Sequence, residues 1–272
     1  MEIDLKNVVA SKSPLLARLI PGMVWRYLHK TLHLTEINFV LTNFSHLPPA
    51  EFIRAALDYM GVDCRIEGLE ELDRAGRYVF ASNHPFGGLD GIILAEAVQA
   101  RMGDVRIIVN DLLMNLPPLT PIFIPVNKHG RQNARTARLL KKTLEGETPV
   151  VTFPAGLCSR RRRGVVHDLP WKDNFVKQAM RYRRDIVPVF VEGRLSDFFY
   201  RLSNLRTSLG IKANIEMLYL VDEMFRQKGK TFRIRVGEPI PWQQVDGWGL
   251  PPARAAAKIC QTVYGMQPGW GI

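Results

Sequence analysis

The sequence predicts an α/β protein, with a mixed, mostly parallel sheet flanked by helices and a helical N-terminal extension. Three observations support this prediction. Short stretches rich in β-branched residues alternate with helical stretches from residue 61 onward, which is typical of a sheet covered by helices on both faces. Residues 13–34 and 50–60 show helical patterns instead. The chain of 272 residues is 46% hydrophobic and 23% charged, as in a globular protein with a sizeable core.

The N-terminal extension is placed at residues 1–60. Residues 13–34 mix apolar and basic side chains at helical spacing, and this leaves two interpretations open. They form two short helices that pack on the core, or an amphipathic element that lies at a membrane surface. A further helix is expected at residues 50–60, between a Pro-Pro pair and a glycine.

The α/β domain is placed at residues 61–272, without a repeat or linker to divide it. The predicted strands lie at residues 62–66, 77–82, 105–109, 121–126, 149–153, 185–191 and 231–237. Helices between them are expected at residues 90–100, 133–144 and 174–182.

Composition restricts the partners and the compartment. Lys plus Arg number 37 and Asp plus Glu number 26, so the net charge is +11 and an anionic partner is expected. The 3 cysteines are far apart, which argues against a disulfide framework or a zinc site, and no metal is predicted. The acidic N-terminus and the lack of a long apolar run argue against a signal peptide or a membrane-spanning helix, so a cytoplasmic location is expected.

Residues 81–91, A-S-N-H-P-F-G-G-L-D-G, are the most informative segment. They join a predicted strand to a predicted helix, and such junctions lie at the edge of an α/β sheet where ligands bind. If Asp90 holds Nδ1–H of His84, the other ring nitrogen can accept a proton from an attacking hydroxyl or amine. The alternative is a structural histidine in a turn, with Asp90 capping the helix.

The N-H-P-x-G-x-x-D-G pattern resembles the first signature block of the glycerolipid and lysophospholipid acyltransferase superfamily, in which a His and an Asp form the catalytic dyad. Five residues separate His84 from Asp90 where most members have four, and this spacing resembles the hemolysin-related, aminolipid-forming branch. Residues 122–128, 153–160 and 186–191 resemble the second, third and fourth blocks, in the expected order.

The resemblance implies a role for each block. His84 and Asp90 would be catalytic, and Gly87 and Gly156 would form turns whose backbone N–H groups receive the developing oxyanion, with a bare turn as the alternative. Substrate contacts are expected from Asn83, Phe86, Lys128, Phe153, Pro154, Ser159 and Arg160. For the basic residues among them, a solvated surface position is the alternative.

Two departures bear on the acceptor. Ala155 and Cys158 stand where the family commonly has the Glu and Arg that contact glycerol phosphate. The F-P-A-G-x-x-S-R form resembles enzymes that acylate the amino group of ornithine or glycine from a 3-hydroxyacyl carrier protein. We therefore expect a fatty or 3-hydroxy fatty acyl group to pass from an acyl carrier protein or coenzyme A thioester to a small polar acceptor, first an amino acid amine. A 1-acylglycerol-3-phosphate hydroxyl is the alternative. The thioester is a co-substrate, and no cofactor is expected.

The basic residues between 131 and 142 and the run at 160–163 suit an acidic carrier protein, a nucleotide-bearing thioester or anionic lipid, with plain solvated charge as the alternative. Peripheral attachment to the inner membrane face follows from the amphiphilic product. A nucleic-acid module lacks stacking aromatics, and a serine hydrolase lacks G-x-S-x-G. An acyl-cysteine at Cys158 is a minor alternative.

Overall fold

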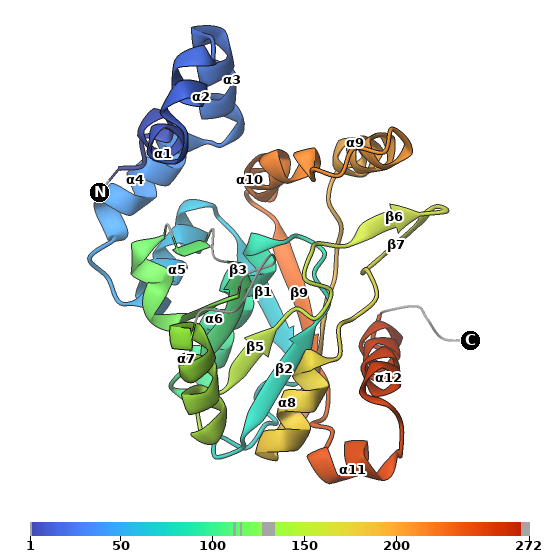
Figure 1. Ribbon diagram of the computed structural model, residues 1–272. Coiled ribbons are helices and arrows are strands. Elements are labelled where there is room, and N and C mark those ends of the chain that lie inside the picture. The colour runs from blue at the N-terminus through green and yellow to red at the C-terminus, as the bar shows by residue number, and fades with distance from the viewer. Residues whose placement is uncertain (1, 111–112, 115, 127–133, 268–272) are drawn as a thin grey trace. The chain divides into compact units, whose positions relative to one another are not determined.

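A computed structural model gives the fold, and the structure describes residues 2–110, 113–114, 116–126 and 134–267 (Figure 1). The chain forms two compact units. Unit 1 comprises Met1–Val62 and Leu195–Lys230, and unit 2 comprises Asp63–Arg194 and Thr231–Ile272. The sequence analysis did not anticipate that residues 195–230 would join the N-terminal helices.

Unit 2 is built on a seven-stranded sheet. Its strands, in spatial order, are β1 (Asp63–Glu67), β9 (Thr231–Val236), β8 (Asp185–Val191), β2 (Tyr78–Ser82), β5 (Val150–Thr152), β3 (Arg106–Asn110) and β4 (Phe123–Val126). Neighbouring strands are parallel except β8 and β9, which pair antiparallel. The predicted mixed, mostly parallel sheet is confirmed, and every strand predicted from the sequence is present within a few residues of its expected bounds.

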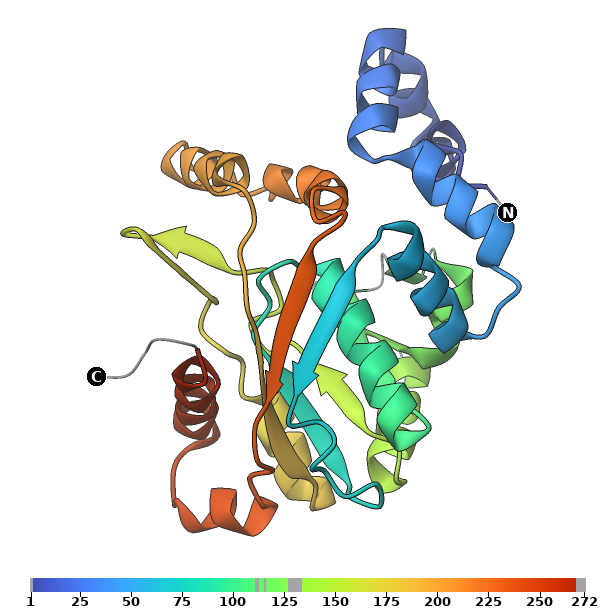
Figure 2. The same cartoon turned by 180° about the vertical axis from the view of Figure 1, so that it is seen from behind.

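Helices cover both faces of this sheet. They are α6 (Gly88–Met102), α7 (Ala134–Glu145), α8 (Asn174–Tyr182), α11 (Trp242–Gly247) and α12 (Pro252–Gly265), with a short 3₁₀ helix, η2 (Pro117–Ile122), before β4. Helices α7, α8, α11 and α12 share one buried apolar cluster with β2, β5 and β8. Helix α6 covers the opposite face, as the view from behind shows (Figure 2). The strand–helix alternation in the sequence therefore predicted this layering correctly.

Strand β2 is central and wholly buried. Val79 and Ala81 face the cluster on the α8 and α12 side, and β-strand alternation directs Phe80 to the other face. Ala81 lies beside Thr152 of β5 and Pro188 of β8. Because these three strands are parallel, the segments that follow them emerge at one edge of the sheet.

A hairpin missing from the sequence prediction follows β5. Strands β6 (Arg160–Arg162) and β7 (Val165–His167) pair antiparallel through a turn at Arg163 and Gly164, where φ is 49° and 85°. Two left-handed residues in sequence are typical of a two-residue hairpin turn. The run of arginines at residues 160–163 is therefore mostly a strand.

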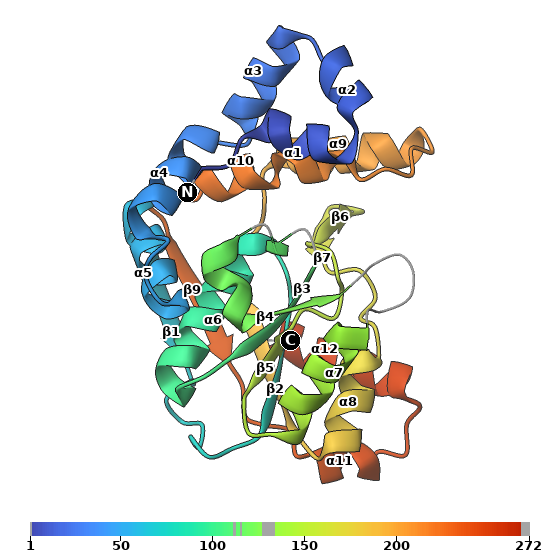
Figure 3. The same ribbon diagram turned by 60° about the vertical axis from the view of Figure 1, so that its left-hand side comes forward.

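Unit 1 is helical. It contains α1 (Leu5–Lys12), α2 (Pro14–Leu19), α3 (Gly22–Thr31), α4 (Leu34–Phe44), α5 (Pro49–Tyr59), α9 (Asp197–Ser208), the 3₁₀ helix η3 (Ile215–Tyr219) and α10 (Leu220–Phe225). Contacts between its two segments include the hydroxyls of Tyr27 and Tyr219, 2.7 Å apart, and His33 Nε2, 3.0 Å from Asp222 Oδ1. Figure 3 shows the helices of this unit in blue and orange. Over the described ranges, none of the helices is both long enough and apolar enough to cross a bilayer.

Candidate active site

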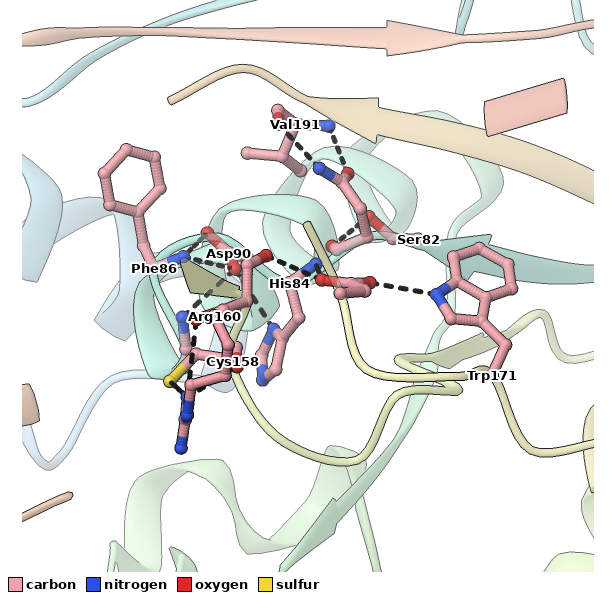
Figure 4. A network of polar contacts seen from close by, with 12 residues as sticks. Ser82, His84, Phe86, Asp90, Cys158, Arg160, Trp171 and Val191 are labelled. Carbon is pink, nitrogen blue, oxygen red and sulfur yellow. Dashed lines mark hydrogen bonds and ion pairs between the residues drawn. The ribbon is translucent and has the colours of Figure 1, made fainter. Parts of the chain in front are cut away.

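The segment between β2 and α6 begins with a side chain that mimics strand pairing. Asn83 Nδ2 donates to the carbonyl oxygen of Val191 at 2.9 Å, and Val191 N–H donates to Asn83 Oδ1 at 2.7 Å (Figure 4). Asn83 is 3% exposed, so this pair of bonds is sheltered from water. It attaches the start of the loop to the end of β8. Asn83, predicted to contact substrate, is thus placed as a structural clamp within the site.

Helix α6 begins with a capping box that contains Asp90. Gly87 is the N-cap residue at φ 76°, a conformation that side-chain-bearing residues rarely adopt. Asp90 Oδ2 accepts hydrogen bonds from the backbone N–H of Phe86 at 3.0 Å and of Gly87 at 3.1 Å. The capping role weighed for Asp90 in the sequence analysis is therefore present, but Asp90 acts from inside the first turn.

The same carboxylate contacts the histidine. His84 Nδ1 lies 3.0 Å from Asp90 Oδ2, with Asp90 completely buried and the His84 side chain 17% exposed. Burial raises the pKa of Asp90, and this outweighs the lowering effects of His84 and the Phe86 amide. An imidazole held at Nδ1 by a carboxylate presents its second nitrogen as a proton acceptor. A histidine placed in this way can serve as an oriented base (Figure 4).

The third block lies directly against this histidine. The Phe153 ring stacks on the imidazole with centroids 4.1 Å apart and an angle of 28° between the planes. Ser159 N–H donates to the carbonyl oxygen of His84 at 2.9 Å. A Cβ atom on Gly91 of α6 would lie 3.6 Å from the Phe153 ring, an ordinary van der Waals distance, so the ring lies beside the first turn of this helix. The first and third blocks, separate in the sequence, form one site.

Arg160 turns inward rather than to solvent. It is 6% exposed, and its Nη1 donates to the Cys158 carbonyl oxygen at 2.6 Å and lies 3.0 Å from Cys158 Sγ. Pro154 is buried, and its carbonyl oxygen accepts from Lys172 N–H at 3.1 Å. Arg160 is therefore a buried member of the third-block loop, and the solvated alternative does not describe it.

Both glycines expected to serve an oxyanion have their own amides engaged. Gly87 N–H donates to Asp90, and Gly156 N–H donates to the carbonyl oxygen of Phe153 at 2.9 Å in a turn with φ 68° at Gly156. The structure therefore shows both glycines shaping their turns, with their own N–H groups bonded within the fold.

Two further residues expected to contact substrate have partners within the protein. Phe86 points away from the imidazole in Figure 4 and packs edge-on against Phe232 at 4.9 Å, because Gly193 leaves space for its ring. Ser159 Oγ donates to Asp168 Oδ1 at 2.6 Å and is 1% exposed, so it faces the interior. Lys128 lies outside the described residues.

Asp168 is a residue that sequence reasoning missed. Its carboxylate receives hydrogen bonds from the Ser159 hydroxyl, the Trp171 indole and the His84 backbone. Nothing in the local sequence distinguishes it from other acidic residues, because its partners come from the first block, the third block and the segment before α8. In the described part of the chain, no group of three or more His, Cys, Asp or Glu side chains is arranged to hold a metal ion.

Comparison with known proteins identifies the class as an enzyme of acyl transfer. The acyltransferase family model matches residues 7–251, and the chain belongs to that family. Within the class, it is a member of the glycerolipid and lysolipid acyltransferase superfamily, as its signature blocks indicated.

Two relatives are similar over nearly their whole length. They are the lyso-glycine lipid O-acyltransferases of Bacteroides thetaiotaomicron and Phocaeicola vulgatus, each 41% identical over 263 residues. The match covers 96% of this chain and 96% and 94% of the relatives. The crystal structure of the 1-acyl-sn-glycerophosphate acyltransferase from Thermotoga maritima is similar in fold, with a TM-score of 0.51 and 14% identity over 89% of this chain and 97% of that one.

Proposed function

We propose that this acyltransferase uses His84 as its general base and Asp90 as the carboxylate that orients it. The observation that carries the proposal is the 3.0 Å contact between His84 Nδ1 and the buried Asp90 Oδ2, at the sheet edge where the signature blocks meet. Phe153 fixes the plane of the ring by stacking on it. The other nitrogen, Nε2, is then the proton acceptor.

The reaction follows from this arrangement. Nε2 of His84 accepts the proton of the acceptor hydroxyl while the oxygen forms a bond to the thioester carbonyl carbon. The tetrahedral intermediate collapses, the carbon–sulfur bond breaks, and the leaving thiolate takes the proton from the imidazolium. Asp90 stabilises that imidazolium across the Nδ1 contact. The thioester supplies all the acyl chemistry, so the chain needs only to bind, orient and move one proton.

We propose the hydroxyl of a lyso-aminolipid of the glycine type as the acceptor. The 41% identical relatives are named for O-acylation of lyso-glycine lipid. Ala155 and Cys158, at the third-block positions of the usual Glu and Arg, are 6% and 1% exposed and offer no charge to a glycerol phosphate. The amine of a free amino acid, favoured by the sequence analysis, takes second place.

One assay distinguishes these acceptors. Purified enzyme is incubated with lyso-glycine lipid, glycine or 1-acylglycerol phosphate, each with an acyl carrier protein thioester and with acyl coenzyme A. We expect an alkali-labile ester of the lyso-glycine lipid by mass spectrometry. Predominant formation of an N-acyl amino acid or of phosphatidic acid would reject the proposed acceptor, and the two parallel series identify the donor.

The proposed base is tested by His84→Ala. The rate of acyl transfer should fall about 10²- to 10⁴-fold, the usual contribution of a positioned general base. His46→Ala is the matched control, because it removes an exposed histidine of unit 1. A folded His84→Ala enzyme that transfers acyl groups at the parental rate would reject His84 as the base.

We further propose that unit 1 binds the surface of an anionic membrane. Helices α2 and α3 expose Leu15, Leu19 and Met23 to 69%, 68% and 75%, next to exposed Arg18 and Arg26. Apolar side chains bordered by cations suit the interface of an anionic bilayer.

Vesicle sedimentation tests this surface. Replacing Leu15, Leu19 and Met23 together by Ser should lower binding of the full chain to anionic vesicles at least tenfold. The control is Leu250→Ser, at an exposed leucine of unit 2. Equal binding by the triple variant and the parent would reject the proposal.

A further inference from the structure

A second buried carboxylate, besides Asp90, contacts the segment that carries His84. Asp168 lies after β7 and is 8% exposed. Its Oδ1 accepts hydrogen bonds from Ser159 Oγ at 2.6 Å and from His84 N–H at 3.3 Å. Its Oδ2 accepts from Trp171 Nε1 at 2.9 Å, a bond visible in Figure 4. All three donors point at one charged group that the reaction described above does not use.

Asp168 is itself held from a separate helix. Its backbone N–H donates to the hydroxyl oxygen of Tyr264 in α12 at 2.8 Å. The His167 ring stacks on Tyr264 with centroids 3.7 Å apart. The carboxylate is therefore anchored to α12 through its own main chain.

Both backbone polar groups of His84 are hydrogen-bonded, one to Asp168 and the other to Ser159. Its N–H donates to Asp168, and its carbonyl oxygen accepts from Ser159 N–H at 2.9 Å. Ser159 in turn donates its hydroxyl to the same carboxylate. Asp90 fixes the imidazole ring, whereas Asp168 and Ser159 fix the backbone from which that ring projects.

We propose that Asp168 is a positioning residue for acyl transfer, acting by accepting the backbone N–H of His84 and the hydroxyl of Ser159. The inference rests on the proposed role of His84 as the base. Displacing a reacting group by about 1 Å can cost about 10²-fold in rate, so holding the main chain of the base has catalytic value. Ser159, expected from the sequence to contact substrate, belongs to this support instead.

The hydrogen-bond inventory of an amide makes the proposal testable. In Asp168→Asn, one oxygen becomes an NH₂ group that can only donate. The Ser159 hydroxyl can rotate to accept from that NH₂, whereas the indole N–H of Trp171 can only donate. The His84 N–H can likewise only donate, so one of the two N–H groups must face the NH₂. Because the Trp171 bond is the shorter, 2.9 Å against 3.3 Å, the amide oxygen will face Trp171 and the NH₂ will face the His84 N–H. Two hydrogen-bond donors, the amide NH₂ and the backbone N–H of His84, then face each other.

Removing the indole donor reverses that preference. In Asp168→Asn combined with Trp171→Phe, the NH₂ can face the phenyl ring, and the amide oxygen can again accept from His84 and Ser159. A double-mutant cycle isolates this coupling. Because Asp168 and Trp171 share one hydrogen bond, their effects on thermal stability will couple whatever the role of Asp168, so the rescue must be seen in kcat.

The experiment measures kcat and KM for the parent, both single variants and the double variant, with circular dichroism and thermal unfolding on each. We expect Asp168→Asn to lower kcat about 10- to 100-fold, with KM changed less than threefold. The double variant should lie within about threefold of Trp171→Phe. Asp173→Asn, a nearby acid that pairs with Lys177, is the control and should change kcat less than threefold.

Two results would overturn the inference: a folded Asp168→Asn enzyme with the parental kcat, or a double variant that loses as much relative to Trp171→Phe as Asp168→Asn loses relative to the parent. His84→Ala is assayed alongside. If it retains activity, the proposed base fails and the role of Asp168 fails with it. If it is inactive while Asp168→Asn is normal, only the role of Asp168 fails. Should Asp168→Asn not fold, Ser159→Ala removes one of the two bonds to Oδ1 and must lower kcat at least threefold.

Discussion

The two ends of strand β2 each hold a buried charge, and the two charges have different partners. At the Tyr78 end lies the guanidinium of Arg184, and beyond the Ser82 end lies the carboxylate of Asp90; both residues are 0% exposed. Burying an ionised group is costly unless hydrogen bonds compensate it. The partners of each buried charge show which of the two can take part in chemistry.

Arg184 is satisfied entirely by main-chain carbonyls. It donates to the carbonyl oxygens of Tyr78, Thr143, Leu144, Gly146 and Thr148 at 2.6–3.2 Å. Two of these residues end α7, so the guanidinium caps that helix, whose last carbonyls lack partners of their own. Burial lowers the pKa of Arg184 to about 10, which leaves it charged at neutral pH. None of these partners titrates.

Asp90 differs in one partner. It also accepts from backbone groups, Phe86 and Gly87 N–H, but its third partner is a histidine that is 17% exposed. Burial and a shifted pKa are common to both ends of the strand, so neither identifies a site by itself. A buried charge in contact with a partly exposed titratable group is what distinguishes the carboxyl edge.

The largest effect is expected from Asp90→Asn. Asp90 Oδ2 both accepts from Phe86 and Gly87 and contacts His84, so the amide oxygen will keep that position to receive the two N–H groups. A neutral amide cannot stabilise the imidazolium that forms when His84 takes up a proton, so kcat should fall by up to about 10⁴-fold. Thermal unfolding should show a folded protein no less stable than the parent at neutral pH. An Asp90→Asn enzyme within tenfold of the parental kcat would place Asp90 with Arg184, as a structural charge.

Arg184→Met tests the opposite end. Five carbonyls lose their donor, and we expect the free energy of unfolding to fall by about 3–5 kcal/mol, as for other broken buried charge networks. Because no partner of Arg184 contacts His84, kcat of the remaining folded enzyme should stay within about threefold of the parent. Urea unfolding and kcat at low temperature measure the two quantities. A stable variant with a hundredfold lower kcat would contradict the structural assignment.

Much of this arrangement was predictable because it depends on local patterns. The β-branched runs gave all seven strands of the main sheet, and the His84 to Asp90 loop was placed at the end of β2. Pairing β2 with both β5 and β8 then brought Phe153 and Val191 to the same loop. Signature blocks are conspicuous in sequence because their residues lie close together along the chain.

The remainder depends on long-range contacts that leave no local pattern. Asp168 meets His84 and Tyr264, which are 84 and 96 residues away. The helices at residues 195–230 join unit 1 through Asp222 and Tyr219, across a separation of nearly 190 residues. The direction of the Phe86 ring depends on the space beside Gly193. The partner of the Gly156 amide is set by the turn that contains it.

The stability of the protein should depend on pH through the buried carboxyl of Asp90. Because the pKa of Asp90 is raised above its ordinary 3.8, the native state binds this proton more tightly than the unfolded state does. The parent should therefore lose stability relative to Asp90→Asn as pH rises from about 3.8 through the raised pKa, and the difference should be constant above it.

The effect should be smaller than that of Arg184→Met, since the contacts with His84 and Phe86 offset part of the burial cost. Urea unfolding of both proteins from pH 4 to pH 8 measures it. Asp246→Asn, at an exposed carboxylate, is the control. If the parent instead gains stability relative to Asp90→Asn as pH rises, the native state favours the ionised carboxylate.

The smallest effect is expected from Cys158→Ser. The thiol is 1% exposed, and a serine hydroxyl can still accept from Arg160 Nη1, which lies 3.0 Å from Sγ. In direct transfer from thioester to hydroxyl, no acyl-cysteine forms, so kcat should change less than threefold. Removing a covalent nucleophile costs far more, up to about 10⁶-fold in a well-studied protease.

Mass spectrometry of the enzyme with donor alone gives the second measurement, and the Cys260→Ser enzyme is the control. Burial raises the pKa of Cys260 to about 12, so its thiol stays protonated and should not be acylated. A loss of 10³-fold in Cys158→Ser, together with an acyl adduct on Cys158 in the parent, would replace direct transfer by a two-step reaction. His84 and Asp90 would then act on a buried thiol, and the carboxyl end of β2 would still be the reactive one.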